Sequence, residues 1–199
     1  MDTTKTKSKT KITKNLMPNT NSSTIKVQKR DGRLEILDIN KIHFVVEEAC
    51  EGLTGVSSSQ IEMNANIQFY DGMTTKDIQN VLVRSANDLI SLEAPNYQYA
   101  AARLLSYDVR KEAHGQYEYI PLLKLILRNI RSGVYDKGIL DKYSKTEIKK
   151  FNTWIKRERD LKFTYAGLRQ ICDKYLVQDR STGQLYETPQ DMYMMIAAT

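Results

Sequence analysis

Cysteine and histidine are scarce in this sequence. Two cysteines, Cys50 and Cys172, and two histidines occur among its 199 residues. The cysteines lie too far apart in sequence for a CxxC pair, so neither a four-ligand zinc site nor a disulfide framework is indicated. We therefore expect two reduced thiols in the core and no protein-bound metal.

Long apolar runs are also lacking. No stretch approaches the roughly 20 apolar residues needed to span a bilayer, and the N-terminus lacks the hydrophobic segment of a secretory signal. With 41% hydrophobic and 27% charged residues, the chain still has enough apolar material for a packed core. These features predict a soluble intracellular protein without a membrane partner.

Positive charge is concentrated at the N-terminus. The net charge of +6 would fit a nucleic-acid-binding protein, but residues 1–23 hold five lysines against one aspartate, so most of that charge lies there. This tail is rich in Thr, Lys, Asn and Ser, and we predict that it is disordered. A solvated extension is favoured over a phosphate-binding arm or an address signal, and nucleic acid is ranked last among possible partners.

Alternating apolar residues predict a β-hairpin at the start of the ordered region. They flank an Asp31-Gly32 turn, at Ile25, Val27, Leu34 and Ile36. Asp38 can then cap a helix whose apolar residues recur at spacings of three and four, at Ile39, Ile42, Val45, Val46 and Ala49.

Further helices complete the expected first domain. Capping residues and apolar periodicity predict them near residues 57–67, 74–90 and 95–109, with Thr74 or Thr75 capping the second and Pro95 opening the third. Gly115 ends this unit. We therefore predict a small sheet over a few helices at residues 24–115.

Residues 116–199 are expected to form a mainly helical domain. Helices are predicted to begin near Pro121, Ser144 and Thr188, with another near residues 168–171 and a second short β-hairpin at 175–186. The last helix reaches the end of the sequence without a cap, so we expect a split gene product or a fragment of a longer protein. The predicted fold class is α+β, mostly α.

The first hairpin carries the densest charge. Lys29, Arg30 and Arg33 crowd its turn beside the helix that Asp38 caps. Such an arrangement suits a polyphosphate, because the cations offset its charge and free amide groups donate to its oxygens. Glu35 and Asp38 would repel phosphate and would instead accept hydrogen bonds from an exocyclic amine such as that of adenine. Charged turns and capping acids also occur widely without a ligand, so spacing alone favours the ordinary interpretation.

Several segments, in order, resemble the ATP-cone, the allosteric adenine-nucleotide domain of ribonucleotide reductases. They are residues 27–32, 40–43, 70–75 and 94–103. The cone also occurs in anaerobic reductases and in a zinc-containing repressor of reductase genes. Residues 110–117, 158–165 and 174–190 resemble the helical region that follows the cone in bacterial and phage class I enzymes. The sequence is therefore identified as the start of a class Ia large subunit.

The resemblance implies a site for ATP or dATP, acting as an allosteric effector and accompanied by Mg²⁺. Lys29, Arg30 and Lys111 match the cations that bind the triphosphate, and Glu35 and Asp38 match the groups near adenine. The remaining implied pocket residues are Val27, Lys41, Ile42, Thr75 and Ile78.

Two departures from the family pattern bear on this site. Relatives often have Asn where this chain has Asp38 and His where it has Gln79, so the base and sugar contacts would differ here. Ordinary structural roles also stay open for two implied ligands. Lys111 could complement the C-terminal end of its helix, and Thr75 could be only a helix cap.

The reaction of the family reduces ribonucleoside diphosphates at the sugar 2′ position. It needs a thiyl-forming cysteine and a redox-active cysteine pair in a catalytic α/β barrel, and neither Cys50 nor Cys172 matches these. We therefore assign no catalytic residue and predict that the chain alone has no reductase activity.

The implied partners are the remainder of the large subunit with its barrel, the small radical subunit, and further copies in a homo-oligomer. The expected location is the cytoplasm, or the host cytoplasm for a phage-encoded chain. The alternative interpretation is a free-standing adenine-nucleotide-binding or interaction protein derived from a reductase fragment.

Overall fold

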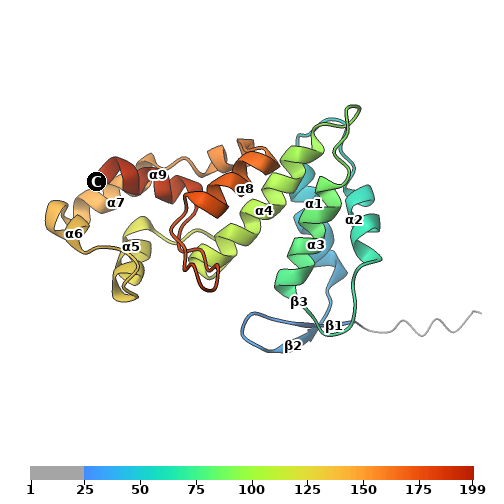
Figure 1. Cartoon of the computed structure of the whole chain (residues 1–199), viewed down its shortest axis with the longest axis horizontal. Coiled ribbons are helices and arrows are strands. Elements are labelled where there is room, and N and C mark those ends of the chain that lie inside the picture. The colour runs from blue at the N-terminus through green and yellow to red at the C-terminus, as the bar shows by residue number, and fades with distance from the viewer. Residues whose placement is uncertain (1–24) are drawn as a thin grey trace, which may run out of the picture.

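The computed structural model describes residues 25–199. The tail at residues 1–23 lies outside the described residues, and its disorder stays a prediction. The described chain is mostly helical with one small sheet near its start (Figure 1), as the sequence predicted. Its elements are β1 (Lys26–Gln28), β2 (Leu34–Ile36), α1 (Ile39–Cys50), α2 (Ser58–Asn66), β3 (Met73–Thr74), α3 (Thr75–Asn87), α4 (Tyr97–His114), α5 (Leu122–Arg131), α6 (Gly138–Lys142), α7 (Lys145–Trp154), the 3₁₀ helix η1 (Arg157–Lys162), α8 (Tyr165–Lys174) and α9 (Pro189–Ala198). None of these helices is long and apolar enough to cross a bilayer.

The sheet begins with the predicted hairpin. β1 and β2 pair antiparallel, with Val27 opposite Glu35, and Gly32 adopts a positive φ of 86° in the turn, a conformation that favours glycine. The sequence did not predict β3, which pairs parallel with β1 on its other edge. Since β3 runs directly into α3, this pairing places the N-terminus of α3 beside the hairpin (Figure 1).

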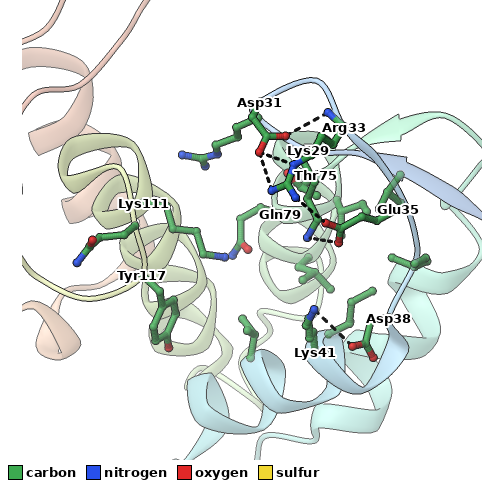
Figure 2. Close-up of a pocket in the computed structure, with 18 of the residues that line it drawn as sticks. Lys29, Asp31, Arg33, Glu35, Asp38, Lys41, Thr75, Gln79, Lys111 and Tyr117 are labelled. Atoms are coloured by element: carbon green, nitrogen blue, oxygen red, sulfur yellow. Dashed lines mark hydrogen bonds and ion pairs between the residues drawn. The ribbon is translucent and has the colours of Figure 1, made fainter.

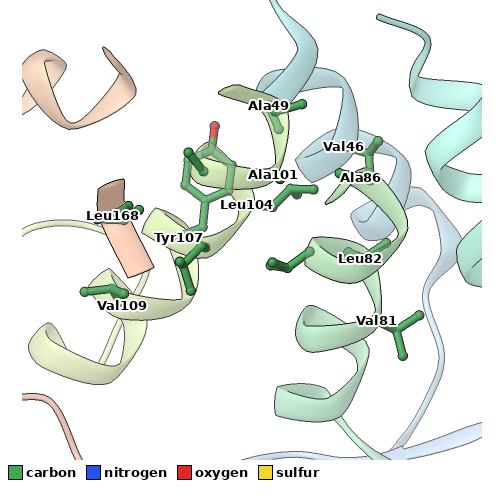
Figure 3. Packing of buried hydrophobic residues seen from close by; sticks show 14 of the residues in the cluster. Val46, Ala49, Val81, Leu82, Ala86, Ala101, Leu104, Tyr107, Val109 and Leu168 are labelled. Atoms are coloured by element: carbon green, nitrogen blue, oxygen red, sulfur yellow. The ribbon is translucent and has the colours of Figure 1, made fainter. Parts of the chain in front are cut away.

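Helix α4 is the central element of the fold. It packs against α1 and α3 on one side and against α8 on another, and three consecutive alanines, at positions 100–102, are fully buried along it. Small residues allow such close packing of neighbouring helices. Figure 3 shows this core, in which Leu82 of α3, Leu104 of α4 and Leu168 of α8 share one cluster.

The apolar core therefore extends past Gly115, where the sequence places the end of the first domain. Gly115 does end α4, with a φ of 74°, but α8 packs on the same helix as α1 and α3 do. A second cluster lies around α5 and α7, and Leu125 and Ile148 are its fully buried members. The division at residue 115 remains a prediction, and α4 contacts the elements on both sides of it.

The second hairpin, predicted at residues 175–186, forms only in part. A single antiparallel bridge joins Gln178 and Leu185. The amide of Tyr186 donates to Val177 O at 3.0 Å. The ladder does not continue, because the amide of Val177 donates to the carboxylate of Glu187 at 2.9 Å and not to the carbonyl of Tyr186. The segment is a tight loop that joins α8 to α9 rather than a pair of strands.

Both cysteines contribute to the apolar core. Cys172 is buried and Cys50 is half-buried, and both are free thiols. Burial raises the pKa of Cys172 to about 12 and that of Cys50 to about 11. Because the thiolate is the reactive form of cysteine, neither side chain is poised for redox chemistry near neutral pH.

A buried polar cluster joins the C-terminal end of α4 to η1 and α9. Asp160 of η1 is 1% exposed, and neither of its carboxylate oxygens has a hydrogen-bond partner among residues 25–199. Burial raises the pKa of Asp160 to about 7, although the charges of Arg157 and Arg110 oppose this shift. Asp160 is therefore a proton-binding group at the contact between these elements.

The raised pKa of Asp160 predicts that the stability of the folded chain depends on pH. An aspartate in an unfolded chain titrates near ~3.9, so between about pH 4 and about pH 7 the folded chain binds a proton that the unfolded chain lacks. The contribution of Asp160 to the free energy of unfolding should thus fall as pH rises through this window and level off above it. Urea unfolding of the wild type and of Asp160→Asn, compared at about pH 5 and about pH 8, should show a weaker pH dependence in the variant. Equal pH dependence in both proteins would contradict the assignment to Asp160.

Candidate functional site

A cavity of about 500 Å³ opens between the hairpin, α1, the start of α3 and the end of α4. Figure 2 shows charged side chains from these elements around one space. Every residue that the sequence assigned to the nucleotide site lines this cavity, namely Val27, Lys29, Arg30, Glu35, Asp38, Lys41, Ile42, Thr75, Ile78 and Lys111. The fold thus brings together residues that are up to 84 positions apart in the chain.

One side of the cavity carries cations. Lys29 and Arg30 come from the hairpin and Lys111 from the last turn of α4. Burial lowers the pKa of Lys111, and the neighbouring Arg30 lowers it further by repulsion. Arg30 is held by Asp108 of α4, whose Oδ1 accepts from its Nη2 at 2.6 Å. Glu35 pairs with Lys29 and Asp108 pairs with Arg30, whereas Lys111 has no ion-pair partner within residues 25–199, so an anion would be attracted to it.

A carboxylate stands at the entrance to α1, apart from the hairpin turn. Asp38 caps this helix by accepting from the amide of Asn40 at 3.0 Å, and its second oxygen lies 3.6 Å from Lys41 Nζ. Glu35 lies 3.2 Å from Lys29 Nζ. Figure 2 shows Asp38 and Lys41 set apart from the hairpin turn. The cavity therefore has a cationic end, which also holds Glu35, and a second end formed by Asp38 and Lys41.

Apolar side chains form the floor between these two ends. Val27, Ile42 and Ile78 line the cavity and are otherwise buried in the core. Thr75 lies above them at the first position of α3, but it is Thr74 that caps this helix, by accepting from the amide of Asp77 at 3.0 Å. Since Thr74 caps the helix, that alternative role for Thr75 is wrong, and Thr75 lines the cavity without being the cap.

Sequence reasoning missed Tyr117, which also lines the cavity. Gly115 turns the chain back after α4, and this returns Tyr117 to the cavity, where its hydroxyl donates to Glu48 of α1. Burial and Glu48 raise the pKa of Tyr117 to about 12. The ring lies 5.6 Å from Lys111 Nζ. The only signal in the sequence was a tyrosine shortly after a helix-ending glycine.

Gln79, noted as a departure from the family, is held by the fold. Its Nε2 donates to the carbonyl of Leu104 in α4 at 2.8 Å, and the residue is 6% exposed. One amide hydrogen is thus engaged inside the protein, which limits what Gln79 can offer to a ligand. Within the described residues there is also no group of three or more His, Cys, Asp or Glu side chains that could hold a metal ion.

The cavity lies in a segment that matches a known domain family. Residues 25–112 match the family described as the ATP cone domain, and residues 161–199 match the family described as ribonucleotide reductase, all-alpha domain. The cavity lies almost wholly within the first of these matches.

Relatives among characterised proteins match across both regions. The chain is 45% identical over 172 residues to ribonucleoside-diphosphate reductase 1 subunit alpha of Escherichia coli (strain K12), which covers 86% of this chain and 23% of that protein. It is 44% identical over 172 residues to the alpha subunit of Enterobacteria phage T4, with 86% and 23% covered. The match to the subunit of Haemophilus influenzae is 40% over 178 residues, with 89% and 24% covered. The chain is thus similar to ribonucleotide reductase large subunits over most of its own length and spans about a quarter of the length of these relatives.

Proposed function

We propose that this chain is the N-terminal allosteric segment of a ribonucleoside-diphosphate reductase large subunit and that its cavity binds ATP or dATP. The observation that carries the proposal is the polarity of the cavity. Three cations gather at one end with Glu35 beside them, Asp38 stands at the other end, and an apolar floor lies between them inside an ATP cone domain. A volume of about 500 Å³ is within the usual range for small-molecule sites.

The polarity of the cavity sets the orientation of the ligand. Lys29, Arg30 and Lys111 would share the triphosphate, because charge-assisted hydrogen bonds to phosphate oxygens are among the strongest available. Glu35 and Asp38 would face the adenine amine as acceptors. Mg²⁺ would arrive bound to the triphosphate, since this ion is commonly held by substrate phosphates and only one or two carboxylates.

The same proposal extends to the complete enzyme. Nucleotide in the cavity would shift the association of large subunits with one another and with the small radical subunit, and thereby control deoxyribonucleotide synthesis by the catalytic barrel. Such control requires that ATP and dATP bind the alternative assemblies with different affinities. We propose a cytoplasmic location, as for the enzyme that supplies DNA replication.

Calorimetry with the whole chain tests the nucleotide site directly. ATP and dATP should bind in the presence of Mg²⁺, and GTP, which carries an oxygen acceptor where adenine has its amine, should bind at least about ten times more weakly. Inorganic triphosphate serves as a second comparison, because it probes the cationic end alone. Absence of binding by both adenine nucleotides would sink the proposal.

Replacement of Asp38 tests the adenine end of the cavity. Asparagine also caps helices well, so Asp38→Asn should leave α1 intact while it removes a charge and adds a donor beside the base. We expect a change of at least about threefold in the ratio of ATP to GTP affinity or of ATP to dATP affinity. The same titrations on the variant measure both ratios. If neither ratio changes, Asp38 does not contact the base or the sugar.

A further inference from the structure

Asp108 stands directly behind the cationic end of the cavity. It lies on α4 one turn before Lys111, and its Oδ1 accepts from Arg30 Nη2 at 2.6 Å, across a separation of 78 residues. The Asp108 side chain is 9% exposed, whereas that of Arg30 is 39% exposed. Asp108 is absent from the lining of the cavity, while Arg30 is part of it. The contact therefore joins the buried carboxylate of Asp108 to the partly exposed guanidinium of Arg30, which lines the cavity.

The charges around Asp108 favour this one contact. Burial raises the pKa of Asp108, and Arg30 is the group that opposes the shift most, ahead of Lys76 and Lys111. Glu112 acts in the opposite sense, but it is itself paired with Lys76 at 3.3 Å. Arg30 is thus the principal counterion of Asp108 in the folded chain.

We propose that Asp108 is a positioning residue of the nucleotide site, which holds the Arg30 guanidinium against α4 so that Arg30 and Lys111 face the same phosphate chain. The inference rests on the proposed function, because it assigns Asp108 a role in ATP binding. It does not place Asp108 in contact with the nucleotide.

The physical basis is the freedom of an arginine on a tight turn. Arg30 lies in the hairpin turn between Lys29 and Gly32. The turn is closed by a hydrogen bond in which Gly32 N donates to Lys29 O at 2.9 Å. A long side chain at such a site samples many rotamers, and fixing it upon binding costs conformational entropy. The ion pair with Asp108 restricts the guanidinium before ATP arrives, so less entropy is lost when the phosphates bind.

The negative charge of Asp108 has an opposing effect, because it repels phosphate. This repulsion would act across the Arg30 guanidinium, whose positive charge offsets it. The direct hydrogen bond to Arg30 is short and charge-assisted, which makes it the stronger of the two effects. Removal of the charge should therefore weaken ATP binding as long as Arg30 is present.

A double-mutant cycle on the whole chain separates these two effects. We expect Asp108→Asn to weaken Mg-ATP binding about three- to tenfold in the wild-type background and by less than about twofold, or to strengthen it, in the Arg30→Ala background. A purely structural role would lower affinity equally in both backgrounds. Asp173→Asn is the matched control, because it removes another α-helical carboxylate that pairs with an arginine, at 3.0 Å from Arg169, outside the cavity lining.

The outcomes distinguish this inference from the proposed function. Equal effects of Asp108→Asn in both backgrounds, or tighter binding in the wild-type background, would overturn the positioning role while leaving the nucleotide site intact. If Asp108→Asn does not fold, Asp108→Glu replaces it. This variant keeps the charge but shifts the carboxylate, and its loss of affinity should likewise vanish without Arg30. If Arg30→Ala alone binds Mg-ATP as the wild type does, the assignment of Arg30 in the proposed function fails, and the positioning role of Asp108 fails with it.

Discussion

Alanine in place of Lys29 or Lys111 should weaken ATP binding by about ten- to a hundredfold for each residue, and loss of both should nearly abolish it. A hydrogen bond between charged groups contributes roughly 1.5–3 kcal/mol, and each factor of ten in affinity corresponds to about 1.4 kcal/mol. Both lysines line the cationic end of the cavity, so each substitution removes a phosphate contact at the same site.

The two lysines should not be equal. Lys29 already lies 3.2 Å from Glu35, and part of what it gains from phosphate is offset by the loosening of that ion pair. Burial and the neighbouring Arg30 lower the pKa of Lys111, and a phosphate anion would relieve that repulsion. We therefore expect the larger loss for Lys111→Ala.

Lys145→Ala provides the control for both substitutions. Lys145 is the first residue of α7, lies outside the cavity lining, and carries the same charge. Calorimetric titration with ATP should give the wild-type affinity for this variant. If Lys29→Ala and Lys111→Ala also bound ATP and dATP as the wild type does, the nucleotide site would have to lie elsewhere.

The parts of the fold that depend on neighbouring residues could be predicted from the sequence. The hairpin follows from alternation around a glycine turn, and α1 follows from Asp38 and the apolar spacing after it. The capping box that joins Ser144 and Glu147 was predicted and is confirmed at the start of α7. Each of these signals lies within a few residues of the structure that it specifies.

Long-range pairings could not be predicted in this way. β3 is two residues long, and its partner β1 lies about 45 residues earlier. No local pattern distinguishes such a strand from a loop. The same limit applies to the packing of α8 on α4 and to the ion pair between Arg30 and Asp108.

The candidate site combines both kinds of information. Spacing alone indicated cations beside a helix N-terminus at the hairpin, but Lys111 and Thr75 entered only through the resemblance to the ATP-cone. Tyr117 entered through neither, because its position depends on how the chain turns at Gly115. The charges of the hairpin thus left an anion site as one alternative, and the fold determined which distant side chains line the cavity with them.

A buried ion network fastens α9 to the end of α4. Asp191 is fully buried and accepts from Arg157 Nη2 at 2.6 Å and from Thr188 Oγ1 at 2.6 Å. His114 Nε2 lies 3.1 Å from the same carboxylate. Because His114 Nδ1 accepts from the amide of Ile120 at 3.3 Å, Nε2 carries the hydrogen that is donated to Asp191. Although burial alone would raise the pKa of Asp191, His114 and Arg157 hold it well below its usual range.

Removal of this carboxylate should strongly destabilise the part of the chain that carries α9. Asp191→Ala leaves His114 buried without its acceptor and Arg157 without its counterion, and breaking a buried ion pair from one side costs about 3–5 kcal/mol. Asp173→Ala, which breaks an exposed pair of α8, should cost no more than about 0.5 kcal/mol. Urea unfolding near neutral pH measures both free energies.

Because the pKa of Asp191 is lowered on folding, the contribution of Asp191 to the free energy of unfolding is complete above about pH 4 and declines as pH falls below that value. The difference between wild type and Asp191→Ala should therefore shrink in acid. A loss below about 1 kcal/mol at neutral pH would mean that water replaces the carboxylate and that the network does not hold α9 in place.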